Sequence, residues 1–120
     1  MYNSQKQYTD YVQAEHMQIL LEDLLYEYKV DIAFWAHYHS YERTCKIYKK
    51  KCVKDGVIHI TVGTAGRERD PEGYYPKTWS LFRARDYGYG RVTVANRNAV
   101  LFEWVTNEHR DVKDSLWLHK

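Results

Sequence analysis

Apolar residues recur at helical spacing early in the chain and at strand spacing later. A helix is predicted over residues 15–28 from one stripe with three- and four-residue intervals, formed by Met17, Leu20, Leu21, Leu24, Leu25 and Tyr28. Glu22, Asp23 and Glu27 lie mainly on the other side, which predicts a solvated acidic face rather than a pair of catalytic carboxylates. Residues 1–11 are polar and have no clear period, so they are predicted to form a loop.

The apolar run from Ile32 to Ala36 predicts a short buried strand directly after this helix. Apolar, mostly β-branched residues predict further strands over residues 56–64, 91–95, 100–106 and 111–118. Asn96, Arg97 and Asn98 predict a hairpin turn, because asparagine tolerates left-handed dihedrals. The lysine-rich residues 44–55 and the charged residues 67–78 predict loops. One helix followed mainly by strands predicts an α/β fold.

Size and charge limit the classes of function. The chain has 120 residues and is 44% hydrophobic, which is enough for one small domain or for part of a larger one. The formal net charge of +2 is too small to indicate nucleic-acid binding. No apolar run approaches the length of a membrane span, and the first residues do not form a secretory signal. We therefore expect no nucleic-acid or membrane partner, while the oligomeric state is left open.

Two histidines stand directly after the first predicted strand. Alternate residues of an extended chain point the same way, so His37 and His39 can project into one cavity at the strand's end. Ligands usually bind at that edge of an open α/β sheet, and imidazole is a common metal ligand. Tyr41, Glu42 and Arg43 follow, and they are predicted to orient the imidazoles by hydrogen bonds. The competing interpretation is a histidine pair that faces solvent or packs under a loop.

The two cysteines, Cys45 and Cys52, leave three alternatives open. They can form a disulfide in an oxidising compartment, remain free thiols, or bind zinc. Together with His37 and His39 they would give a small His2Cys2 zinc domain, because these ligand types suit tetrahedral zinc.

The sequence Ala-His-Tyr-His-Ser-Tyr-Glu-Arg over residues 36–43 resembles the Gly-His-x-His-x-Tyr-Glu-Arg motif of the purple acid phosphatases, within the metallophosphoesterases. Ala36 stands where the motif usually has glycine, which is a mild departure. Residues 1–4 resemble the end of the family's His-x-Pro-x-Tyr-x-Ser segment, and residues 63–66 its glycine-rich turn. Residues 80–91 resemble its Ser-x-x-Arg…Phe/Tyr-Gly segment, so the resemblance extends along nearly the whole chain.

The resemblance implies that residues 1–120 are a single partial domain, the C-terminal portion of a four-layer αββα metallophosphoesterase sandwich. It implies an acid phosphatase that hydrolyses phosphomonoesters at a dinuclear metal centre, with iron(III) beside zinc, iron or manganese. By analogy His37 would bind the divalent ion and His39 the iron. The resemblance also favours a disulfide between Cys45 and Cys52 and a secreted or vacuolar parent protein.

Other ligand motifs of the family do not occur in this sequence. The family uses Asp-x-Gly, Asp-x-x-Tyr and Gly-Asn-His-Glu/Asp motifs, and no catalytic residue can be assigned here without them. A closed site needs about four ligands per ion, which two imidazoles do not supply. We therefore expect the chain alone to be inactive and the activity to belong to the full-length parent. The alternative is a phosphatase-like interaction module without catalysis.

Overall fold

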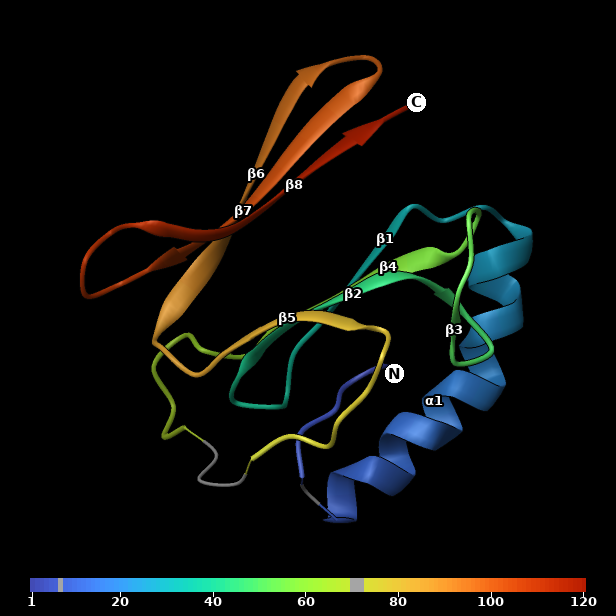
Figure 1. The fold of residues 1–120 in the computed structure, drawn as a ribbon, viewed down its shortest axis with the longest axis horizontal. Coiled ribbons are helices and arrows are strands. Elements are labelled where there is room, and N and C mark those ends of the chain that lie inside the picture. Colours follow the sequence, from blue (N-terminus) through green and yellow to red (C-terminus); the bar gives the residue numbers. More distant parts are fainter. Residues whose placement is uncertain (7, 70–72) are drawn as a thin grey trace.

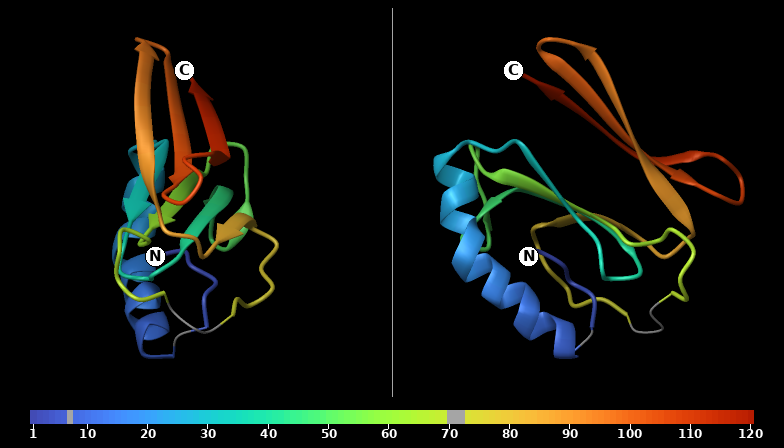
Figure 2. Two further views of the ribbon diagram at one scale, coloured as in Figure 1. Left: turned by 90° about the vertical axis from the view of Figure 1, so that its left-hand side faces the viewer. Right: turned by 180° about the vertical axis from the view of Figure 1, so that it is seen from behind.

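The elements of the chain form three stacked layers (Figure 1). The computed structural model describes residues 1–6, 8–69 and 73–120. Helix α1 (Tyr8–Glu27) covers one face of a five-stranded sheet, and a three-stranded sheet covers the other face, as the two views of Figure 2 show. No helix among the described residues is long and apolar enough to cross a membrane. One helix followed mainly by strands confirms the predicted α/β fold.

The five-stranded sheet brings two strand ends together at one edge. Its main order is β1 (Ile32–Trp35), β4 (Val57–Val62), β2 (Tyr41–Tyr48) and β3 (Lys51–Cys52), and β5 (Ser80–Ala84) also pairs with β2. Strands β1 and β4 are parallel, whereas β2 is antiparallel to β3, β4 and β5. Because β1 and β4 run in the same direction, the loops that follow them leave the sheet at the same edge.

The second sheet is a meander of β6 (Gly88–Asn96), β7 (Ala99–Thr106) and β8 (Val112–His119). The chain reverses between Asn96 and Ala99, which confirms the predicted hairpin turn. The core between the two sheets contains Tyr41, Ile60 and Trp104, all 0% exposed, and the rings of Tyr41 and Trp104 stack with centroids 4.5 Å apart. Aromatic stacking of this kind adds to the apolar area that the sheets bury.

Helix α1 differs from the prediction at its start and in its buried face. It begins at Tyr8 rather than at residue 15, since the smaller buried residue Ala14 continues the inner face. Leu21 and Leu25 pack against the sheet, but Leu20 and Leu24 are 75% and 50% exposed. The predicted apolar stripe is thus only partly buried.

The predicted solvated acidic face of α1 is wrong in part. Glu22 Oε1 accepts hydrogen bonds from the Tyr2 hydroxyl at 2.5 Å and from the Lys49 backbone N–H at 2.9 Å. Asp23 accepts one from the Tyr48 hydroxyl at 2.9 Å. These carboxylates therefore attach the helix to neighbouring segments instead of only facing solvent.

The prediction of a loop over residues 44–55 is also wrong, because β2 and β3 form a hairpin there. Lys49 and Lys50 make its two-residue turn with φ values of 48° and 63°. Such turns usually carry Asn-Gly, so the lysines offered no sequence signal. The hairpin packs on α1, where the Tyr48 and Tyr26 rings stack 3.9 Å apart, and lysines at its exposed edge hide the strand pattern.

Cys45 and Cys52 are joined by a disulfide across this hairpin, with Cα atoms 5.8 Å apart. We expect Cys45→Ser/Cys52→Ser to lower the free energy of unfolding by about 2 kcal/mol, because the unfolded chain regains the freedom of the closed loop. Urea unfolding of the variant and of the oxidised chain measures this difference. Equal midpoints and slopes would show that the crosslink adds nothing to stability.

Candidate metal centre

The loop between β1 and β2 carries both candidate ligands. Tyr38 and Ser40 are 6% and 0% exposed, whereas His37 is exposed and His39 is half-buried. Residues 36–40 are irregular and Ala36 and His37 are both exposed, so the predicted alternation of an extended chain ends at Trp35, the last residue of β1. His37 adopts a φ of 80°, a conformation that costs energy for a residue with a Cβ. The structure thus places the two histidines at the strand end, and their role as metal ligands stays a prediction.

The loop that follows β4 supports the histidine loop from one side. The Gly63 backbone N–H donates to the Ser40 carbonyl at 3.0 Å. A Cβ on Gly63 would lie 1.7 Å from the Tyr38 carbonyl oxygen, so only glycine fits this close approach. Ala36, where the family motif has glycine, does not adopt a positive φ. Its Cβ therefore causes no backbone strain of that kind.

Glu42, which is predicted to orient the imidazoles, also joins other segments of the chain. Its carboxylate is 1% exposed and accepts hydrogen bonds from the Ser4 backbone N–H at 2.7 Å and the Ser4 hydroxyl at 2.6 Å. The Ser80 hydroxyl donates to it at 2.5 Å, and Arg83 lies 3.5 Å away. Glu42 thus attaches the N-terminal segment and β5 to the strand that follows the histidines.

Tyr41 and Arg43 likewise bind a residue of the second sheet. The Tyr41 hydroxyl donates to Asp114 Oδ2 at 2.6 Å, and Arg43 donates from Nε and Nη2 to the two carboxylate oxygens at 2.7 and 2.8 Å. Burial, and then the hydrogen bond to Asp114, raise the pKa of Tyr41, and the same carboxylate raises the pKa of Arg43. We call these three residues the Asp114 clamp, since they join β2 to β8.

His59 is a buried imidazole on the helix side of β4. Trp35 Nε1 donates to its Nδ1 at 2.9 Å, and the two rings stack with centroids 5.8 Å apart. Burial, with a smaller contribution from the Met1 ammonium, lowers the pKa of His59 from 6.5 to about 3. The side chain is therefore a neutral hydrogen-bond acceptor above that pH.

The side chains available as metal ligands supply only part of the metal centre that the family implies. Among residues 1–6, 8–69 and 73–120, no three or more His, Cys, Asp or Glu side chains lie close enough to hold a metal ion together. The disulfide occupies both cysteines, so the His2Cys2 zinc domain has no thiolate ligands. Two imidazoles beside a polar loop fit part of a nitrogen and oxygen ligand set. The remaining ligands would have to come from outside the described residues.

Comparisons with known proteins agree with this fold. Residues 56–115 match the family model described as iron/zinc purple acid phosphatase-like protein C. The chain is 35% identical to probable purple acid phosphatase 20 of Arabidopsis thaliana, with 98% of this chain and 29% of that protein covered. It is 36% identical to probable inactive purple acid phosphatase 27 of the same plant, with 83% and 18% covered.

A solved structure shows the same arrangement of elements. Purple acid phosphatase PPD1 from yellow lupin (Lupinus luteus) seeds superposes with a TM-score of 0.73 at 33% identity, covering 82% of this chain and 19% of that one. The chain thus spans between about a fifth and a third of the length of these relatives. The matching family model, the shared sequence and the shared fold together show that the chain belongs to the purple acid phosphatase family, in the region of its C-terminal domain.

Proposed function

We propose that the chain contributes two ligands to the dinuclear centre of a purple acid phosphatase whose full-length form hydrolyses phosphate monoesters. The observation that carries this proposal is the histidine loop at the shared edge of the parallel strands β1 and β4. His37 would hold a divalent zinc, iron or manganese ion and His39 an iron ion. Such ions, when bound, lower the pKa of a water molecule and polarise the phosphate ester. The protein's own part is to hold both imidazoles in place.

The uncovered edges of the two sheets are evidence that the chain is part of a larger catalytic domain. Among the described strands, β1 pairs only with β4, and β6 pairs only with β7. Phe34 contacts Phe102 across the sheets with ring centroids 5.5 Å apart, yet it is 50% exposed. Val92 and Val94 pair with Phe102 and Val100 and share their face, but they are 53% and 71% exposed. Apolar residues of the inner faces are therefore uncovered at neighbouring edges, where further strands would cover them.

The disulfide supports an oxidising compartment, and thus a secreted or vacuolar parent protein. The substrate would be a phosphate ester, and we propose no nucleic-acid or membrane partner. A phosphatase-like interaction module without catalysis is the second candidate, since a relative that is 36% identical carries the word inactive in its name. Both candidates share the fold and differ in whether the centre binds metal.

Metal content after refolding in iron and zinc tests the proposal. We expect the isolated chain to bind metal weakly, to lose it in His37→Ala/His39→Ala, and to show no turnover of nitrophenyl phosphate. The matched control His16→Ala/His119→Ala removes two exposed imidazoles elsewhere and should leave the metal content unchanged. In the full-length protein, His37→Ala/His39→Ala should lower kcat at least 100-fold.

Three results would contradict the proposal. Turnover by the isolated chain would show that its own residues complete the centre. Equal metal content in the histidine variant and the control would show that His37 and His39 are not ligands, and an inactive full-length protein would favour the interaction module.

A further inference from the structure

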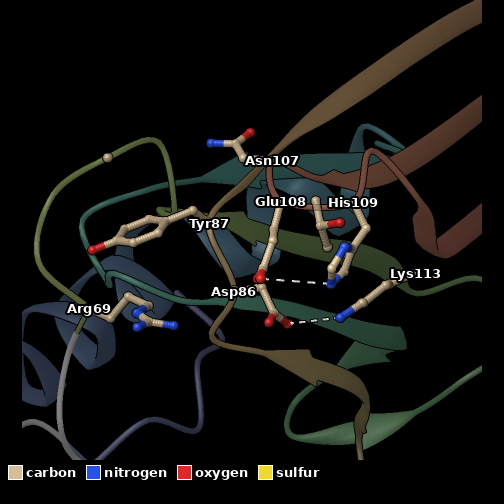
Figure 3. A pocket seen from close by; sticks show the side chains of 9 residues that line it. Arg69, Asp86, Tyr87, Asn107, Glu108, His109 and Lys113 are labelled. Carbon is tan, nitrogen blue, oxygen red and sulfur yellow. Dashed lines mark ion pairs between the residues drawn. The ribbon is translucent and has the colours of Figure 1, made fainter.

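A hollow lies beside the loop that follows β4, at the end of the second sheet where β6 begins (Figure 3). We call it the Arg69 pocket; its volume is about 620 Å³, and it is lined by Gly66, Arg69, Asp86, Tyr87, Thr106, Asn107, Glu108, His109 and Lys113. These residues come from three separate segments: the loop after β4, the β5–β6 connection, and the β7–β8 turn with the start of β8. Nothing in the proposed phosphatase centre uses this pocket.

Backbone hydrogen bonds join the three segments. Gly88 N–H donates to the Thr64 carbonyl at 3.2 Å, and the Thr64 hydroxyl donates to the Gly88 carbonyl at 3.1 Å. Asn107 N–H donates to the Tyr87 carbonyl at 2.8 Å. Thr64 is 0% exposed, so its bonds are shielded from water. The walls of the pocket are therefore held together before any ligand arrives, which lowers the entropic cost of binding.

The charges in the pocket leave Arg69 without an acidic partner among the described residues. Lys113 lies 3.5 Å from Asp86, and His109 lies 3.8 Å from Glu108. Arg69 instead lies 4.9 Å from the centre of the Tyr87 ring and donates to the Arg85 carbonyl at 3.4 Å. A guanidinium carries five N–H donors, so most of them remain for an incoming acceptor. With His109 neutral, the pocket holds two cations and two carboxylates, but Arg69 lies apart from Glu108 (Figure 3), so its guanidinium offers a local place for an anionic group.

The shape of Arg69 suits an oxyanion, and the proposed phosphatase function makes phosphate the ligand we argue. A guanidinium held against an aromatic ring keeps a fixed plane, and its paired N–H groups match two oxygens of a phosphate. The partly exposed ion pair of Asp86 and Lys113 is worth little, so Lys113 can turn to a second phosphate oxygen. The loop that carries Arg69 also contacts the histidine loop at Gly63, so the pocket and the candidate metal centre share one supporting loop.

We propose that the Arg69 pocket binds a phosphate group, with Arg69 as its main contact and Tyr87 as the surface that orients the guanidinium. As it rests on the proposed function, the ligand would be the non-transferred phosphate of a substrate that carries two or more phosphates. Lys113 adds a second positive charge, while Asp86 competes with the ligand for it.

Binding of inorganic pyrophosphate to the chain, in buffer with a metal chelator, tests the pocket. Isothermal titration gives the affinity, and amide NMR shifts at Gly66 and Tyr87 give the place of binding. We expect Arg69→Ala to weaken binding at least tenfold, because it removes a charge-assisted pair of hydrogen bonds. Asp86→Asn should strengthen binding severalfold, since it releases Lys113.

Arg97→Ala is the matched control, because Arg97 is exposed in the turn at the far end of the same sheet. It removes the same charge and should leave the affinity unchanged. The proposal is overturned if the unaltered chain shows no saturable binding, or if Arg69→Ala and Arg97→Ala bind pyrophosphate equally well. The chelator makes this outcome independent of His37 and His39, so failure here leaves the phosphatase proposal intact. Failure of the metal test would leave phosphate binding in the Arg69 pocket intact and would remove its assignment to a phosphatase substrate.

Discussion

Asp114→Ala is expected to lower the free energy of unfolding by about 3–5 kcal/mol, the range for breaking one side of a buried ion pair. Asp114 is 7% exposed and accepts three hydrogen bonds from Tyr41 and Arg43. Without it, the charge of Arg43 remains largely buried between the sheets with no carboxylate to compensate it. Urea unfolding monitored by tryptophan fluorescence measures this loss in the free energy of unfolding.

Two further variants separate the ion pair from general damage to the core. Tyr41→Phe removes a single hydrogen bond to a charged group, so we expect it to lower the free energy of unfolding by about 1.5–3 kcal/mol. The double variant Arg43→Met/Asp114→Leu removes both charges and should cost less than the sum of its single variants. A loss below about 1 kcal/mol for Asp114→Ala would show that the Asp114 clamp contributes little to sheet packing.

The second large effect concerns stability in acid. His59 has a pKa of about 3 in the folded chain and a reference value of 6.5, so below pH 6.5 the unfolded chain binds more protons. The stabilisation that the neutral imidazole confers is complete above pH 6.5 and is lost as the pH falls toward 3. Between pH 7 and pH 5 we expect His59 to lower the free energy of unfolding by about 2 kcal/mol.

His59→Gln tests the assignment of this acid sensitivity. Glutamine keeps an oxygen acceptor for Trp35 Nε1 but does not titrate. The free energy of unfolding of the variant should therefore fall much less between pH 7 and pH 5 than that of the unaltered chain. Its stability at pH 7 need not equal that of the unaltered chain, because only the slope with pH is compared. An unchanged slope would assign the acid sensitivity to other groups than His59.

The spacing of apolar and turn residues along the chain was sufficient to predict much of the fold. The strands at Ile32–Trp35 and Val57–Val62 follow from short apolar runs, and the β6–β7 hairpin follows from two strands around an asparagine turn. The pattern failed at the β2–β3 hairpin, where exposed lysines occupy edge and turn positions that other residues normally fill. It also missed the first turns of α1, whose inner face is formed there by Ala14.

The candidate metal site and the Arg69 pocket differ in how far the sequence alone could predict them. The candidate ligands of the metal site could be named from the sequence, because His37 and His39 come shortly after a predicted strand and lie within a long family motif. The Arg69 pocket could not, since no local spacing joins Arg69 to Tyr87 and Lys113. Sequence signals of a site are strongest where its residues are neighbours along the chain.

The sequence by itself determined the α/β class, most strands, and the place of the histidine pair, because these depend on contacts between residues close in the chain. Only the tertiary structure decided that Tyr41 and Arg43 bind Asp114, and that Glu42 binds Ser4 and Ser80. These partners lie between 38 and 73 positions apart. Which of them meet depends on how the layers stack, since hydrogen bonds act over about 3 Å and carry no local sequence signature.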